Sequence, residues 1–194
     1  MKSDLTGKII FFATSNVHKF DEARVVLSQY GLATAMIRMK GKEIQSDSLA
    51  EIAAVSASGA YNQLQLPTIV EDAGLFINAL NGFPGPYAAY IYKTIGNAGI
   101  LTLMQTIQDR QATFRSAIAY CESSSEVICF EGEAAGRITK EQHKGERSAF
   151  GFDPIFQPDG VDKTFAEMTL AEKNRFSHRA AALREFAEWY KKHV

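Results

Sequence analysis

The chain has 194 residues, enough to bury one substantial hydrophobic core and few enough to form a single domain over residues 1–194. Its 21 Lys and Arg side chains balance 22 Asp and Glu side chains, which excludes the overall positive field that attracts nucleic acid or an anionic membrane. Any anion site must therefore be built locally. The apolar run at residues 9–13 is far shorter than the roughly 20 residues of a membrane span, so we expect a cytoplasmic protein.

The first half of the chain alternates strand and helix patterns. Runs of β-branched and aromatic residues predict the strands, and apolar residues at helical spacing predict the helices. Gly31 gives a helix stop, and Ser48 with Glu51 has the spacing of a capping box. The expected order is a strand at 8–13, a helix that ends near residue 30, a strand at 32–39, a helix at 48–63 and a strand at 68–74, with residues 75–80 left open as a continuation of that strand.

The second half is antiparallel in character. Asn97 is expected to cap a helix that lasts to about residue 108, and Ser177 is expected to begin a terminal helix. Thr169 and Glu172 form another capping box. Three strands are expected at 113–121, 126–130 and 133–139, the first two as a hairpin. This order predicts an α/β domain with a mixed, twisted sheet flanked by helices.

The turn between the first strand and the first helix carries several polar donors. They are Thr14, Ser15, Asn16 and Lys19. Free backbone N–H groups and the positive end of the helix dipole join these side chains there, which suits a polyphosphate. Ordinary N-capping by Ser15 or Asn16, with Lys19 in solvent, explains the same residues, and the turn alone does not decide between the two.

The strand at 68–74 begins as an apolar run, at 68–70, and leads into two adjacent carboxylates, Glu71 and Asp72. A third carboxylate, Glu43, lies in an earlier loop. Ionised groups at the end of a buried strand are costly unless a cation or a proton shares them. Mg²⁺ accepts one or two carboxylates and completes its octahedron with phosphate and water oxygens, so Glu43 and Asp72 would suffice. A solvated Glu43 and simple capping by the acidic pair remain the alternative.

An aromatic segment follows further along the chain, at Phe150, Gly151, Phe152 and Asp153. Aromatic faces beside a flexible glycine and a carboxylate can stack a nucleobase and accept a hydrogen bond from its ring N–H. A core strand that ends at Asp-Pro explains the segment equally well. Three donors gather around the start of the last helix, where they suit a carbonyl oxygen or a phosphate: Lys173, His178 and Arg179. His178 alone is also typical of a structural hydrogen bonder.

In combination and order, these segments resemble the inosine triphosphate pyrophosphatase family. The resemblance rests on the runs ATSNVHK, KEIQ, IVEDAGL, NGFPGPY, FGFDPIF, TFAEMT, EKN and SHRAAAL, between residues 8 and 186. It implies a Mg²⁺-dependent hydrolase, usually a homodimer, that converts ITP, dITP and XTP to the monophosphate and pyrophosphate. It also implies an elongated α/β fold with two lobes around an active-site cleft.

The resemblance further implies a role for each candidate residue. Triphosphate contacts fall to Thr14, Asn16 and Lys19, metal ligation to Glu43 and Asp72, and base binding to residues 150–153 with Lys173, His178 and Arg179. Asp72 also matches the usual proton acceptor, although Glu71 beside it stays open as the base. Two positions depart from the family pattern: Ala73, within the substrate site, replaces a common serine, and the segment around Ser58 lacks a common lysine.

Base choice follows from hydrogen-bond complementarity. A 6-oxo purine would accept from Arg179, His178 or Lys173 and donate its N1–H to Asp153, whereas adenine would leave these groups unpaired at a cost of ~1–3 kcal/mol each. Two alternatives stay open: a pyrophosphatase for modified pyrimidine or methylated nucleotides, and a non-catalytic nucleotide-binding module. A paired-carboxylate glycosidase is disfavoured because it has no need of the phosphate-type turn.

Overall fold

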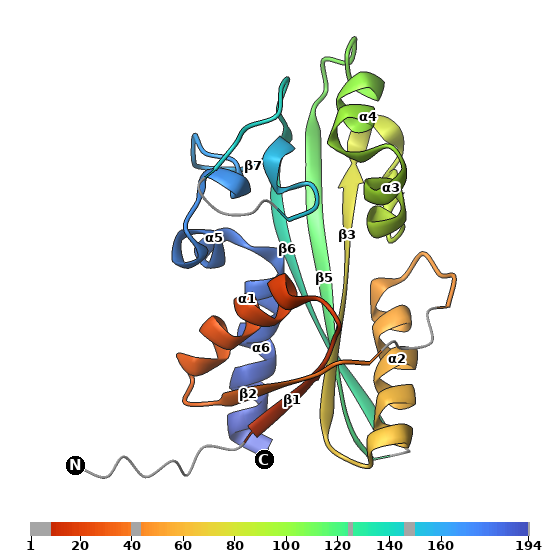
Figure 1. Cartoon of the computed structure of the whole chain (residues 1–194), viewed down its shortest axis with the longest axis vertical. Coiled ribbons are helices and arrows are strands. Elements are labelled where there is room, and N and C mark those ends of the chain that lie inside the picture. Colours follow the sequence, from red (N-terminus) through yellow and green to blue (C-terminus); the bar gives the residue numbers. More distant parts are fainter. Residues whose placement is uncertain (1–8, 40–43, 124–125, 146–149, 194) are drawn as a thin grey trace, which may run out of the picture.

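One mixed sheet runs along an elongated molecule in a computed structural model that describes residues 9–39, 44–123, 126–145 and 150–193 (Figure 1). The strands are β1 (Ile9–Ala13), β2 (Ala33–Ile37), β3 (Thr68–Ile77), β4 (Pro84–Gly85), β5 (Gln111–Ser123), β6 (Glu126–Ile138) and β7 (Phe156–Pro158). Their order is β2-β1-β3-β5-β6-β7, with β4 paired to β3. The pairs β1–β2 and β1–β3 are parallel and the others are antiparallel, which confirms the predicted mixed α/β fold.

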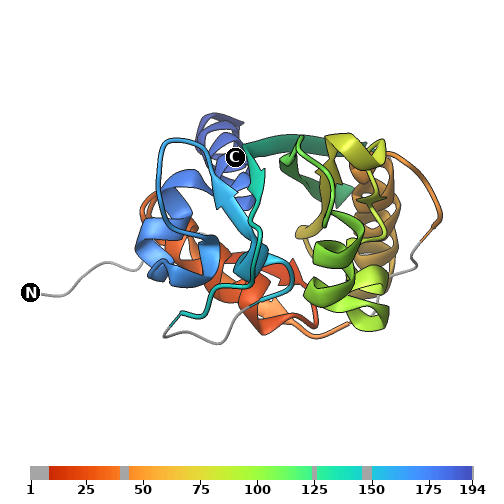
Figure 2. The same cartoon turned by 90° about the horizontal axis from the view of Figure 1, so that it is seen from above.

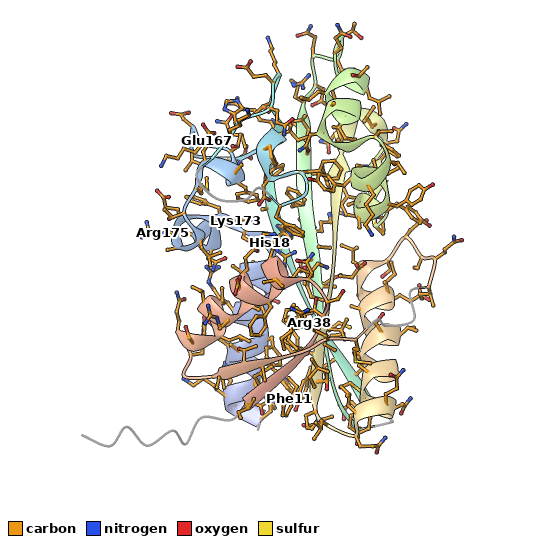
Figure 3. All side chains as sticks on the ribbon, in the orientation of Figure 1. Phe11, His18, Arg38, Glu167, Lys173 and Arg175 are labelled. Atoms are coloured by element: carbon orange, nitrogen blue, oxygen red, sulfur yellow. The ribbon has the colours of Figure 1, made fainter. Side chains whose placement is uncertain are left out.

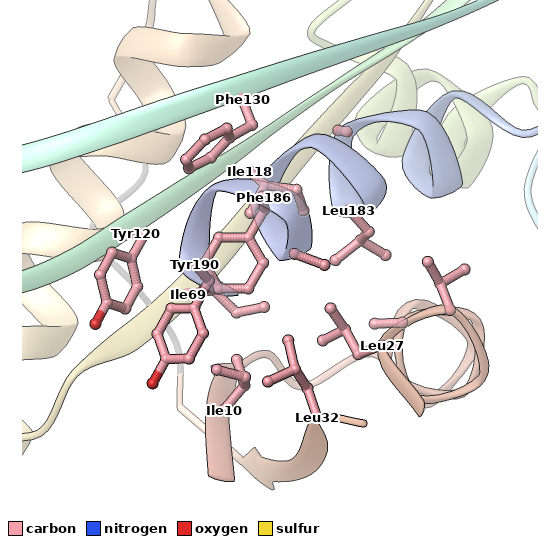
Figure 4. Packing of buried hydrophobic residues seen from close by; sticks show 14 of the residues in the cluster. Ile10, Leu27, Leu32, Ile69, Ile118, Tyr120, Phe130, Leu183, Phe186 and Tyr190 are labelled. Carbon is pink, nitrogen blue, oxygen red and sulfur yellow. The ribbon is translucent and has the colours of Figure 1, made fainter. Parts of the chain in front are cut away.

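Helices flank the sheet on both faces, some along its lower half and some along its upper half (Figure 1). They are α1 (Val17–Ser28), α2 (Leu49–Leu64), α3 (Ala88–Thr94), α4 (Gly96–Leu103), α5 (Leu170–Phe176) and α6 (His178–His193). Alternating residues of β5 serve the two faces, because successive side chains of a strand point in opposite directions. Ile118 and Tyr120 pack with α1 and α6 (Figure 4), while Ala117 and Ala119 pack against α2.

A second apolar cluster fills the upper half of the molecule, between α4 and the segment around β7. Ile100 and Met104 of α4, Phe114 of β5 and Phe156 of β7 are all buried there. Three short 3₁₀ helices complete this half: η1 (Asn78–Leu80), η2 (Asp153–Ile155) and η3 (Phe165–Glu167). Figure 2 shows α3 and α4 on one side of the molecule and the β7 segment on the other. No helix of the described chain is long and apolar enough to cross a membrane.

Several predicted boundaries are wrong. The strands expected at 126–130 and 133–139 form one strand, β6, because the small residues Gly132 and Ala134 continue its buried face. The helix expected at 97–108 is α4, which begins at Gly96, a residue with the positive φ of +61°, and ends already at Leu103, and the unpredicted α3 precedes it. Asn97 therefore lies inside α4 and does not cap it.

The acidic pair also lies elsewhere than expected. The strand predicted at 68–74, with 75–80 open as its continuation, extends to Ile77, so Glu71 and Asp72 sit in its middle and not at its end. β1 pairs with β3 only at Thr68 and Ile69, and β4 pairs with it only at residues 75–76. Between these contacts, residues 70–74 have no strand partner on that edge among the described residues. The edge is therefore open to side chains and to a ligand.

Candidate active site

A cleft of about 490 Å³ lies along this open edge of β3, within the usual size range of small-molecule sites. Its walls come from the β1–α1 turn, from α3 and from the start of α6. Every predicted site residue that the structure describes lines it: Thr14, Ser15, Asn16, Lys19, Asp72, Ala73, Phe150, Gly151, Phe152, Asp153, Lys173, His178 and Arg179. Glu43 lies outside the described residues. The chain thus brings four sequence-distant segments to one place.

The β1–α1 turn is a capped helix start that also faces the cleft. Asn16 Oδ1 accepts hydrogen bonds from the backbone N–H groups of His18 (3.0 Å) and Lys19 (3.3 Å), and Thr14 Oγ1 accepts from Asn16 N at 3.1 Å. N-capping by Asn16 is therefore confirmed. A solvated Lys19 is wrong, because its Nζ lies 2.7 Å from Glu71 Oε2 and 3.3 Å from the Glu71 carbonyl oxygen.

Glu71 is buried and fully engaged by cations. Its Oε1 accepts hydrogen bonds from Ser116 Oγ at 2.8 Å and from Arg179 Nε at 3.0 Å, opposite the Lys19 contact. Burial alone would raise the pKa of Glu71, but Arg179 and Lys19 outweigh it and lower the pKa to about 2. Glu71 is thus ionised and held in place. Asp72 is half-buried and lines the cleft, so the two neighbouring carboxylates have different environments.

Glu22, a residue that sequence reasoning missed, completes this network from α1. Its side chain is 1% exposed and lies 2.7 Å from Lys173 Nζ and 2.5 Å from Arg179 Nη1. Burial opposes ionisation, yet Arg179 and Lys173 hold the pKa of Glu22 far below its usual range. The available signal was helical spacing, because Glu22 shares the buried face of α1 with Ala23 and Val26.

Lys173 links this network to the aromatic segment. Its Nζ lies 2.6 Å from Asp153 Oδ2, and burial raises the pKa of Asp153 despite that contact. Figure 3 shows Lys173 on α5 near His18, at the N-terminal end of α1. The partly buried Lys19 and the buried Lys173 and Arg179 therefore meet three buried carboxylates, Glu22, Glu71 and Asp153. The network is balanced in charge and pre-organises its donors before any ligand arrives.

The aromatic segment presents one ring to the cleft and buries the other. Phe150 is half-buried and stacks on His18, with ring centroids 5.2 Å apart and an angle of 25° between the planes. Phe152 is buried in the upper apolar cluster, so only its exposed edge borders the cleft. Gly151 between them has the positive φ of +56°, and Asp153 N donates to Phe150 O at 3.1 Å to close the turn. Phe150 is the ring best placed to stack a base.

His178 is buried, neutral and incompletely hydrogen-bonded. Burial lowers the pKa of His178 well below its ordinary value, and the neighbouring Arg179 adds to the effect. Its ring stacks on Phe114 at 4.7 Å, and its Nδ1 has no hydrogen-bond partner among the described residues. The start of α6 reaches this depth because Gly132 of β6 has no side chain, since a Cβ there would lie 2.3 Å from His178 O. A ligand atom can supply the missing partner of Nδ1.

A family model described as the Ham1 family matches residues 10–189. The chain belongs to the Ham1 family. It is similar to two proteins named dITP/XTP pyrophosphatase. The one from Methanopyrus kandleri is 50% identical over 185 residues, 95% of this chain and 97% of that protein. The one from Methanothermobacter marburgensis is 47% identical over 181 residues, 93% of this chain and 95% of that protein. A solved structure of a HAM1 protein from Coxiella burnetii superposes with a TM-score of 0.81 at 28% identity, covering 95% of this chain and 99% of that one.

In this Ham1 chain, Ile52 and Ser56 of α2 line the cleft, whereas Ser58 is not among the lining residues. Ser56 is 6% exposed. Ala73 does line the cleft, so the missing hydroxyl at that position is a change within the site.

The donor set of the Ham1 site suits a hard cation held by few carboxylates. Among the described residues, no group of three His, Cys, Asp or Glu side chains could hold a metal ion. Mg²⁺ needs only one or two carboxylates, and Glu71 is already engaged by Lys19, Arg179 and Ser116. Asp72 is half-buried and lines the cleft, and an oxygen donor there suits Mg²⁺.

Proposed function

We propose that this chain hydrolyses the nonstandard purine nucleoside triphosphates ITP, dITP and XTP to the nucleoside monophosphate and pyrophosphate. The observation that carries the proposal is the meeting, in one cleft, of a capped helix start, an accessible Asp72 and buried donors around Phe150. The names of the relatives from Methanopyrus kandleri and Methanothermobacter marburgensis point to dITP and XTP among these substrates. A nucleotide would lie with its phosphates near the β1–α1 turn and its base near Phe150.

Base selection follows from groups that need a partner. His178 Nδ1 is buried and unpaired among the described residues, and a 6-oxo purine offers it a hydrogen-bonding atom. Lys173 and Arg179 are fixed by Glu22, so they cannot turn away from a mismatched base without breaking buried ion pairs. Adenine presents a donor where these groups also donate, at a cost of ~1–3 kcal/mol for each unpaired group. ATP is therefore expected to be a poor substrate.

Asp72 is the proposed general base. Glu71 is a poor candidate because Lys19 and Arg179 lower its pKa to about 2 and occupy both of its oxygens. Asp72 would take a proton from the attacking water as the water oxygen bonds to the α-phosphorus, and the bond to the bridging oxygen breaks to release pyrophosphate. Glu43 and Asp72 would hold Mg²⁺, which when bound would neutralise charge on the phosphate oxygens.

A substrate panel tests the proposal. Release of pyrophosphate is measured from ITP, dITP, XTP, GTP and ATP, with and without Mg²⁺, and extended to modified pyrimidine and methylated nucleotides. We expect fast, Mg²⁺-dependent release from ITP and XTP and slow release from ATP. Equal rates on all purines would refute the specificity, orthophosphate as the first product would refute the pyrophosphatase reaction, and tight ITP binding without turnover would favour a binding module.

We also propose, from the sequence resemblance, that the protein is a cytoplasmic homodimer. Light scattering on the purified protein should give twice the mass of the chain. A mass equal to that of one chain across the micromolar range would contradict the dimer.

A further inference from the structure

Helix α3 forms a wall of the cleft for which sequence reasoning assigned no role. Four of its residues line the cleft: Ala88, Ala89, Tyr92 and Lys93. Ala88 and Tyr92 are four positions apart, as are Ala89 and Lys93, which is the spacing of residues on one helical face. The helix therefore turns one continuous face toward the site, and that face ends in an ammonium group.

Two contacts tie this wall to the aromatic segment. The ring of Tyr92 meets Phe152 edge to face, with centroids 5.6 Å apart and planes at 84°. Just beyond α3, Asn97 Nδ2 donates to Gly151 O at 3.3 Å, and Asn97 is 7% exposed. Lys93 lies between these two anchors in sequence, so its backbone is held in place at the edge of the cleft.

Lys93 differs from the other cations of the cleft in its ion pairing. Lys19, Lys173 and Arg179 each contact one or two buried carboxylates, which neutralise them. Lys93 is exposed, and the ion pairs found among the described residues do not include it. A phosphate chain brings several negative charges into a site whose buried network has no net charge to offset them. Lys93 can supply such a charge without losing an existing partner.

We propose that Lys93 is a further binding residue, which contacts the phosphate chain of the substrate from the α3 wall. The inference rests on the proposed function only in taking a nucleoside polyphosphate as the ligand. It adds the unneutralised charge of Lys93 on the α3 wall to the donors of the β1–α1 turn on another wall of the cleft. The substrate would thus be held between these two walls.

The test compares Lys93→Gln with the unchanged protein in steady-state hydrolysis of ITP at fixed excess Mg²⁺. Loss of one partly exposed charged contact should raise KM about threefold to tenfold and change kcat less than twofold. Inorganic tripolyphosphate and inosine then serve as competitive inhibitors that mimic the two halves of the substrate. The inhibition constant for tripolyphosphate should rise as KM does, and that for inosine should stay within twofold.

Two control variants accompany this test. Lys93→Arg keeps the charge, so its KM for ITP should stay close to that of the unchanged protein. Lys192→Gln removes an exposed lysine at the end of α6 and should leave KM and both inhibition constants unchanged. An unchanged KM, or a shift for inosine and not for tripolyphosphate, would overturn the proposal. If the unchanged protein fails to hydrolyse ITP, the proposed function fails, and calorimetric binding of ITP to both proteins still decides the role of Lys93.

Discussion

Replacement of Glu71 by Gln tests the central electrostatic feature of the site. Gln has nearly the same shape but carries no charge, so Lys19 and Arg179 lose the carboxylate that they share. The pKa of Glu71 falls from 4.5 to about 2, and each pKa unit corresponds to about 1.36 kcal/mol, so ionised Glu71 contributes about 3 kcal/mol to folding. This agrees in size with the ~3–5 kcal/mol expected when one partner of a buried ion pair is removed.

The pH dependence of this effect has a definite sign. The folded-state pKa of Glu71 is lowered, so its stabilisation is fully present above the unfolded-state value of 4.5 and is lost as the pH falls through about 2. Urea unfolding at pH 7 should therefore show Glu71→Gln less stable by about 3 kcal/mol. At pH 3 the difference should shrink to less than half.

A matched control separates this effect from a general loss of surface charge. Glu133 pairs with Arg115 at 3.0 Å on the surface, where both side chains are about half exposed. Glu133→Gln should change the free energy of unfolding by less than ~1 kcal/mol at either pH. Two results would show that the buried network does not depend on this charge: a free energy of unfolding that falls by less than ~1 kcal/mol in Glu71→Gln at pH 7, or a fall at pH 3 as large as that at pH 7.

Two further substitutions address the chemistry and the packing. Asp72→Asn should lower kcat for ITP by about 100-fold or more, because an amide cannot take the proton of the attacking water. Its circular dichroism spectrum and urea midpoint should stay close to those of the unchanged protein, and near-normal turnover would remove Asp72 from its role. Gly132→Ala should destabilise the protein by ~1–3 kcal/mol, because the new Cβ would lie 2.3 Å from His178 O. Thermal unfolding measures this loss of stability. Gly59→Ala is the control: a Cβ at Gly59 meets nothing within 4 Å, so this variant should not be destabilised.

The local chemistry of the chain made much of the fold predictable. Capping residues marked helix starts correctly, since Ser48 accepts from Glu51 N and Thr169 with Glu172 forms a full capping box. These interactions connect residues three apart, so they depend little on the rest of the molecule. The positions of β1, α2 and α6 were close to the predictions for the same reason.

Predictions failed where distant segments decide the outcome. β3 extends beyond the acidic pair because β5 pairs with it along its whole length, as far as Ile77. Asn97 has the composition of a helix cap, yet its amide is used by Gly151, which lies 54 residues away. The expectation that Glu71 might serve as a base could not be tested without knowing that Arg179, 108 residues further on, binds it.

The sequence by itself determined the fold class, the segments that carry polar groups and, through resemblance, the family and its candidate residues. Those properties depend on short-range patterns and on residue identity. Only the tertiary structure decided how the charges are shared. It placed Glu22 among Lys173 and Arg179, separated the environments of Glu71 and Asp72, and brought Lys93 to the cleft. The free energy of a charge depends on its burial and on partners within a few ångströms, and folding alone sets those distances.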